Sequence, residues 1–88
     1  MVTKGERVQS KNILGKTVVS KAGKTFGIVG DIIFETKTGE LIYIVLKNPT
    51  PYALNFDLQK DEKGRLQIPF SAVVAIGDYV LVAEEDIL

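Results

Sequence analysis

Short runs of β-branched and aromatic residues recur along this chain, and residues that favour turns close each run. Runs of this length suit strands and are too short for typical helices. Gly23, between the first two runs, can adopt the positive φ that a tight hairpin turn requires. We expect six strands, over residues 16–20, 26–35, 41–46, 52–59, 65–70 and 78–83.

Residues 71–77 interrupt this series because they are small and apolar without a clear alternation. Ser71 can cap a single helical turn there and Gly77 can end it. Gly27 and Gly30, inside the second strand, indicate a bend or bulge of the kind that lets a sheet curl. Closing the sheet removes its exposed edges. The predicted fold is therefore all-β: a small six-stranded antiparallel β-barrel with one short helical turn before the last strand.

The chain has 88 residues, which is enough for one small core and too few for two. Residues 1–12 are polar and follow neither strand nor helix periodicity, so we expect a flexible or loosely docked arm. Residues 84–88 form an acidic tail that ends in two apolar residues. The folded domain is expected over residues 13–83.

Alternation along the strands assigns one set of apolar residues to the interior. A large aromatic side chain such as Phe34 should contribute several kcal/mol there, roughly 3–5 kcal/mol by comparison with truncations in other cores. The expected core residues are Phe26, Ile28, Ile32, Phe34, Ile44, Phe56, Ile68 and Leu81.

A second set of apolar residues falls opposite these core positions. One small barrel has a single interior, so a second apolar face usually marks an interface. The terminal apolar pair of the tail is suited to docking in a groove or adding to a sheet. The expected interface with a partner or a second copy consists of Val29, Ile33, Tyr43, Val45, Ile87 and Leu88.

Histidine, cysteine and tryptophan are all absent, which removes the commonest general base, metal ligands and thiol nucleophile. Asp31 and Glu35 share a strand face, but paired-carboxylate hydrolysis needs a cleft and one raised pKa, and divalent ions usually recruit several clustered carboxylates. Solvated surface charges explain the two residues better. The glycines of residues 23–27 lack the spacing and the following helix of a phosphate-binding loop. We therefore expect no enzymatic activity, no metal and no cofactor.

Eleven basic and eleven acidic residues give a net charge of zero, but the charges are unevenly distributed. Residues 1–30 carry six basic and one acidic side chain, and residues 61–88 carry two basic and six acidic. Small barrels can bind nucleic acid through basic grooves with stacking aromatics. Most aromatics here fall on inward faces, which disfavours nucleic acid as a partner.

The chain contains no apolar run near the ~18 residues of a membrane span, and the basic residues at its start precede no apolar segment. Without cysteine the fold needs no oxidising compartment. We expect a cytoplasmic protein with no insertion into a membrane.

Four segments of the chain resemble the PRC-barrel family, which is named after the photosynthetic reaction centre. The resemblance extends from about Leu14 to Ala83. Its most specific part is the closing pattern of proline and aromatic, short turn, Ile-Gly-Asp and apolar strand. The segments are Leu14-Gly-Lys-Thr-Val-Val-Ser, Gly23-Lys-Thr-Phe-Gly-Ile-Val-Gly-Asp-Ile-Ile-Phe, Thr38-Gly-Glu-Leu-Ile-Tyr-Ile-Val-Leu and Ile68-Pro-Phe-Ser-Ala-Val-Val-Ala-Ile-Gly-Asp-Tyr-Val-Leu-Val.

Family membership specifies a fold rather than a chemistry. The resemblance implies a non-enzymatic protein–protein adaptor, in its sharpest version one that links a SepF-type anchor to the archaeal cell-division machinery. The implied partners are a second copy in a homodimer, a SepF-type division protein or a second PRC-barrel protein. The alternative is an RNA- or ribosome-associated module related to ribosome maturation factors. Those factors carry an additional N-terminal domain for which 88 residues have no room, so the adaptor is favoured.

Overall fold

Eight strands form one sheet in the computed structural model, which describes residues 2–3 and 13–87. The predicted all-β fold is confirmed, and the helical segments are short: α1 (Pro51–Leu54), η2 (Phe70–Ala72) and η3 (Glu84–Asp86). The strands are β1 (Val2–Thr3), β2 (Thr17–Ser20), β3 (Thr25–Phe34), β4 (Leu41–Lys47), β5 (Gln59–Lys60), β6 (Leu66–Pro69), β7 (Val73–Ile76) and β8 (Tyr79–Val82).

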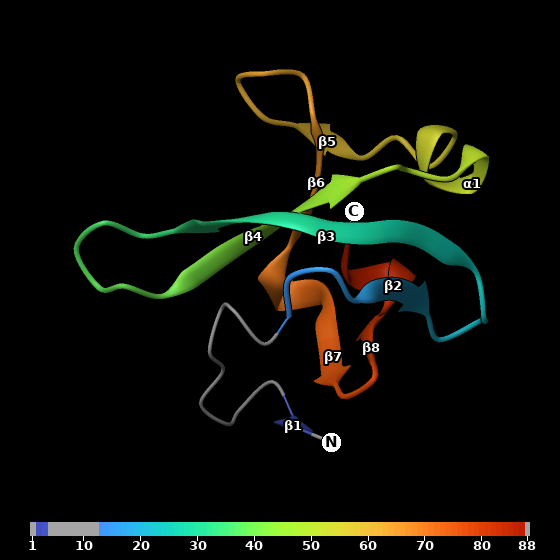
Figure 1. The fold of residues 1–88 in the computed structure, drawn as a ribbon, viewed down its shortest axis with the longest axis horizontal. Helices are drawn as coiled ribbons and strands as arrows, with labels where there is room; N and C mark the ends of the chain where they lie inside the picture. Colours follow the sequence, from blue (N-terminus) through green and yellow to red (C-terminus); the bar gives the residue numbers. More distant parts are fainter. Residues whose placement is uncertain (1, 4–12, 88) are drawn as a thin grey trace.

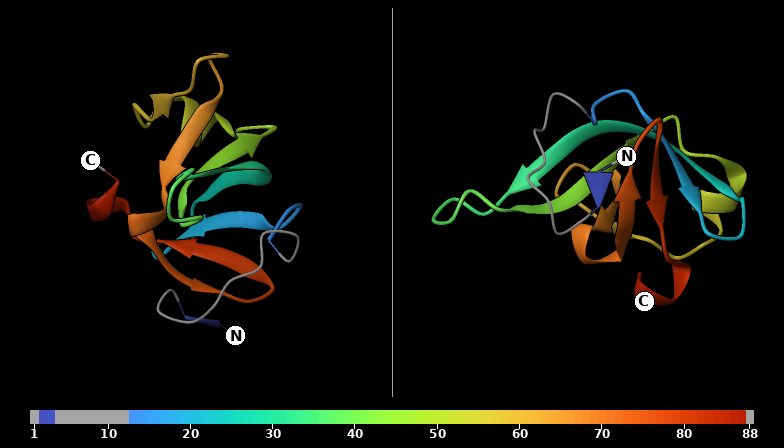
Figure 2. Two further views of the ribbon diagram at one scale, coloured as in Figure 1. Left: turned by 90° about the vertical axis from the view of Figure 1, so that its left-hand side faces the viewer. Right: turned by 90° about the horizontal axis from the view of Figure 1, so that it is seen from below.

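The strand order is β1-β7-β8-β2-β3-β4-β6-β5, with β1 and β5 at the two ends. Neighbouring strands are antiparallel except β2 and β8, which pair in parallel. This pairing places a strand from the start of the domain beside a strand from its end (Figure 1). The sheet twists and curls around the core, as the two turned views show (Figure 2).

A bulge at Gly30 changes the direction in which the side chains of β3 point. Val29 pairs with Leu46 and Asp31 pairs with Val45, so Gly30 is one extra residue on β3. A Cβ atom at Gly30 would lie 2.6 Å from the Cβ of Lys47, which explains the glycine. Val29 itself follows an irregular pairing at Phe26, where Gly27 pairs with Val18 and Thr25 pairs with Val19. It points inward and is 1% exposed in the core. The prediction that Val29 lies on an outer face is therefore wrong.

Three of the predicted core residues, Phe26, Ile44 and Ile68, are fully buried, and Ile32 and Phe56 pack against them. The core also contains side chains from every long strand and from the segment before β2. Its remaining buried members include Ile13, Val18, Val73, Val80 and Val82.

The core prediction is wrong for Phe34, which is 45% exposed. Ile28 and Leu81 are half-buried and lie outside the core cluster. A second register shift directly precedes Phe34, which pairs with Leu41 near the end of the β3–β4 ribbon. Figure 1 shows this ribbon extending beyond the other strands, so few neighbours are available to cover Phe34.

The strand expected over residues 52–59 is wrong, because most of this segment is helix and turn. Thr50 caps α1: its Oγ1 accepts a hydrogen bond from the Ala53 backbone N–H at 3.2 Å, and Pro51 occupies the first helical position. Tyr52 of α1 and Phe56 of the following turn lie beside each other, with ring centroids 5.8 Å apart. Both rings pack edge-on against Phe26, with centroids 5.4 and 5.3 Å away. Only Gln59–Lys60 joins the sheet, as β5.

The helical turn expected over residues 71–77 is shorter than predicted. It is the 3₁₀ turn η2, and Val73–Ile76 instead forms β7, which pairs with β8. The backbone groups of this segment form hydrogen bonds with β8, and its β-branched residues favour the extended conformation of a strand.

The ends of the chain are the expected flexible or loosely docked arm and the expected acidic tail. The tail is docked: Ile87 packs against the core, the Tyr52 hydroxyl donates to the Glu84 carboxylate, and Lys21 pairs with Glu85 at 3.3 Å. Of the predicted arm, β1 pairs with β7, and residues 1 and 4–12 lie outside the described part of the chain.

Candidate functional site

The face of β3, β4 and β6 that points away from the core carries the candidate site, and we call it the outer face. Ile33 lies opposite Tyr43, and Val45 lies opposite Gln67. Ile33 and Tyr43 are both half-exposed, so the structure brings these two predicted interface residues together at the surface. Val45 shares the face but is 1% exposed, which makes it a supporting residue rather than a contact surface.

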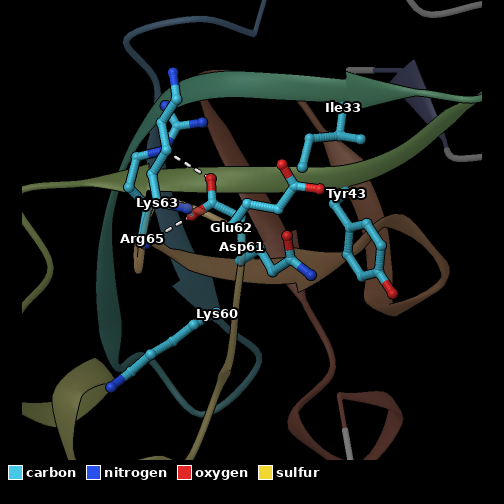
Figure 3. A pocket seen from close by; sticks show the side chains of 8 residues that line it. Ile33, Tyr43, Lys60, Asp61, Glu62, Lys63 and Arg65 are labelled. Atoms are coloured by element: carbon cyan, nitrogen blue, oxygen red, sulfur yellow. Dashed lines mark hydrogen bonds and ion pairs between the residues drawn. The ribbon is translucent and has the colours of Figure 1, made fainter.

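The hairpin between β5 and β6 rises beside this face and closes one side of a groove of about 480 Å³ (Figure 3). The floor is apolar and amide in character, and the hairpin contributes charged side chains. The groove is lined by Ile33, Tyr43, Lys60, Asp61, Glu62, Lys63, Arg65 and Gln67.

Arg65 ties the hairpin to β3. Its Nε donates to Asp61 Oδ2 at 2.7 Å, and its Nη1 lies 3.3 Å from Asp31 Oδ2. Because β4 lies between β6 and β3 in the sheet, this side chain crosses the outer face of β4. Asp61 Oδ1 also accepts from the backbone N–H groups of Lys63 and Arg65, at 3.0 and 2.8 Å. These bonds fix the shape of the hairpin turn.

Both carboxylates of this network are held in the charged form. The backbone N–H of Ile32 and the Arg65 guanidinium lower the pKa of Asp31, although desolvation opposes them. For Asp61, desolvation raises the pKa, but the backbone and side-chain N–H groups of Arg65 outweigh it and the pKa is lowered. A general acid needs a raised pKa, so Asp31 is unsuited to the acid/base pairing with Glu35 considered above.

Gln67 is the unusual polar residue of the site. Its side chain lines the groove, yet the residue is only 7% exposed, and its Oε1 has no hydrogen-bond partner among the described residues. A buried acceptor without a donor costs about 1–3 kcal/mol. Sequence reasoning missed Gln67, since a polar residue between Leu66 and Ile68 fits the ordinary outward position of a strand.

The remaining predicted interface residues do not join this face. Val29 lies in the core and Ile87 packs against it. Leu88 lies outside the described residues.

Six basic residues lie within residues 1–30, and the three of them that the structure describes are engaged within the domain. Lys16 Nζ donates to the Gly77 carbonyl, Lys21 pairs with Glu85, and Lys24 Nζ lies 5.9 Å from the centroid of the Tyr52 ring. These contacts leave less basic surface for a nucleic-acid backbone than the sequence indicates. The other three basic residues, Lys4, Arg7 and Lys11, lie outside the described part.

The described part of the chain offers neither a metal-binding cluster nor a membrane-spanning helix. Residues 2–3 and 13–87 contain no group of three or more His, Cys, Asp or Glu placed to hold a metal ion. In the same part of the chain, no helix has the length and apolar character that would let it cross a membrane.

Comparison with known proteins extends the fold assignment. The uncharacterized protein MJ1118 of Methanocaldococcus jannaschii is 27% identical to this chain over 82 residues, which cover 93% of this chain and 88% of MJ1118. The profile of the PRC-barrel domain matches residues 5–86 and therefore nearly the whole chain. Together with the curled sheet, this match shows that the chain belongs to the PRC-barrel domain family.

Proposed function

We propose that this protein is a non-enzymatic adaptor that binds other proteins through its outer face. The observation that carries the proposal is the pairing of Ile33 and Tyr43, two half-exposed side chains that lie in register and line the groove. Binding surfaces commonly combine an apolar centre that includes an aromatic residue with a charged rim. The charged side chains of the β5–β6 hairpin provide that rim.

The sharpest form of the proposal is a link between a SepF-type anchor and the archaeal cell-division machinery. The support for it is membership of the PRC-barrel family and similarity to a protein of an archaeon. We also propose that the chain forms a homodimer, with Ile33 and Tyr43 contributing to the contact. A second PRC-barrel protein is a further partner consistent with the same surface.

The test compares two charge insertions at exposed apolar positions. Ile33→Asp places a carboxylate on the outer face, and Leu54→Asp does so on α1, where the side chain is 62% exposed. With an immobilised SepF-type protein of the source organism, we expect Ile33→Asp to lose binding at least about tenfold, as for a central contact residue, and Leu54→Asp to bind normally. Equal binding by wild type and Ile33→Asp would remove the outer face from the proposal.

Sedimentation equilibrium of the same proteins tests self-association. The wild type should form dimers at micromolar concentration, and Ile33→Asp should yield folded monomers. A wild-type monomer at high micromolar concentration would refute the homodimer.

A salt titration separates the adaptor from the RNA- or ribosome-associated alternative. Nucleic-acid binding weakens steeply with salt because counterions are released, whereas an apolar protein contact does not. Binding to a single-stranded RNA oligomer that survives Ile33→Asp and falls steeply with salt would favour the alternative.

A further inference from the structure

The groove combines three features that suit one kind of ligand. The first is the Gln67 Oε1, a buried acceptor with no donor among the described residues. The second is the half-exposed ring of Tyr43, whose face can attract a cation. The third is the Glu62 carboxylate: it has no hydrogen bond or ion pair in the described part, and Figure 3 shows it directed toward the region of Ile33 and Tyr43.

The charge that faces Ile33 and Tyr43 favours a cation, although the groove lining as a whole carries both signs, with Lys60, Lys63 and Arg65 beside Asp61 and Glu62. Arg65 pairs with both Asp31 and Asp61, so its charge is already engaged. Figure 3 shows Lys60 and Lys63 extending away from Ile33 and Tyr43, and Glu62 directed toward them. Glu62 therefore supplies the negative charge that an entering cation would meet.

We infer that this groove binds an arginine or lysine side chain of a partner protein. The aliphatic stem of such a side chain would lie on Ile33, and the charged end would meet the Glu62 carboxylate and the Tyr43 ring. The unpartnered Oε1 of Gln67 can accept a hydrogen bond from the entering N–H group. This inference rests on the proposed function, because it names the chemistry that the outer face selects.

The probe is the peptide acetyl-Ala-Arg-Ala-amide, titrated into the ¹⁵N-labelled full chain and followed by NMR. We expect saturable shifts of the Gln67 side-chain amide and of the Tyr43 backbone amide. The same peptide with citrulline in place of arginine keeps the shape but removes the charge, and it should give no saturable shift. Equal shifts with both peptides, or none with either, would overturn the inference.

Variants locate the binding within the groove. Glu62→Gln should weaken the arginine peptide about threefold to fivefold, the range typical of an exposed ion pair. Tyr43→Leu should weaken it by a similar factor of about three if the ring contributes a cation–π contact. Glu40→Gln removes an equal charge on the β3–β4 turn, outside the groove, and should leave the affinity unchanged. Glu62→Lys should abolish binding, and unchanged affinity in Glu62→Lys would contradict the site.

The peptide titration and the partner test fail in different ways. If the peptide does not bind but Ile33→Asp still abolishes binding of the partner, the proposed interface is supported and the inferred arginine or lysine ligand is wrong. If the peptide binds and Ile33→Asp still binds the partner, the inferred ligand site is supported and the proposed adaptor surface is wrong.

Discussion

Residues 25–29 and residues 31–34 belong to the same strand, but the first stretch lies inside the domain and the second lies on a protruding ribbon. The first stretch pairs with β2 on one side and β4 on the other, and α1 covers its Phe26. Among the described residues, the second stretch pairs with β4 alone. Phe26 is accordingly 0% exposed and Phe34 45%. Identical residues on one strand therefore serve different purposes: one stabilises the fold and the other leaves surface available.

The largest expected effect is the difference between these two phenylalanines. Phe26→Ala removes a fully buried ring that contacts two other aromatics, and it should cost about 3–5 kcal/mol of the free energy of unfolding. Phe34→Ala should cost about 1 kcal/mol or less, as for other partly exposed positions. Urea denaturation followed by circular dichroism measures both. Similar losses for the two variants would show that the ribbon is as tightly packed as the body.

Gly30 separates the two stretches, and Gly30→Ala tests the close contact that requires it. The new Cβ would meet the Lys47 Cβ at 2.6 Å, so we expect a loss of about 1–3 kcal/mol from overpacking. The control is the same substitution in a Lys47→Gly background, which lacks the opposing Cβ. There the loss should be smaller, and equal losses in both backgrounds would mean that the steric explanation is wrong.

The inner stretch depends on the hydroxyl of Thr50. It donates to the Thr25 carbonyl at 2.6 Å and accepts from the Ala53 N–H at 3.2 Å, so it joins β3 to the start of α1. Thr50→Ala should destabilise the protein by about 1 kcal/mol, the usual cost of losing an N-cap. Thr50→Ser keeps the hydroxyl and should remain close to wild type. A Thr50→Ser variant as unstable as Thr50→Ala would assign the effect to the lost methyl group instead.

The outer stretch depends on charge, so acid should loosen its anchor to the hairpin. The pKa values of Asp31 and Asp61 are lowered in the folded protein. The two ionised carboxylates therefore contribute fully to the free energy of unfolding above the pKa of the unfolded chain, about 3.9. This contribution is lost as the pH falls through the pKa of the folded protein. The difference in the free energy of unfolding between wild type and Arg65→Gln should be present near neutral pH. It should disappear below about pH 4. A difference that stays constant with pH would exclude the ion pairs as its source. This is the smallest effect expected, because Arg65 and Asp31 are both in contact with solvent, which screens their attraction.

The sequence indicated the place of the bulge but not its effect on the strand. Gly27 and Gly30 indicate that the strand bends, but simple alternation does not show the effect of two irregularities. The shift at Phe26 turns Val29 inward, and the extra residue at Gly30 restores the predicted faces of Ile32 and Ile33. Each extra residue exchanges inward and outward positions, because the period of a strand is two. Register is set by pairing with β2 and β4, and pairing is not visible in one strand alone.

Residues 52–59 illustrate a different ambiguity. Tyr52, Leu54, Phe56 and Leu58 alternate as in a strand, but Tyr52 and Phe56 also have the spacing of neighbours on a helix. The Thr-Pro pair at residues 50–51 is the local signal for a helix start, and it identifies the correct alternative.

The candidate site was predictable in part. Ile33 and Tyr43 could be placed together because strands 26–35 and 41–46 follow each other through a short turn and form a hairpin. The groove could not be predicted, since it depends on how the β5–β6 hairpin leans over the sheet. The contact of Arg65 with Asp31, which ties this hairpin to β3, joins residues 34 positions apart in the sequence.

The position of β8 has a consequence for how the domain folds. β8 lies between β7 and β2, so a strand from the end of the domain occupies an interior place in the sheet. Until β8 docks, one edge of β2 has no partner, and Val18 lacks its neighbour Val80. Contacts of such long sequence separation slow folding. The folding chain therefore carries an open strand edge until its two halves meet, and an open edge favours association with other chains.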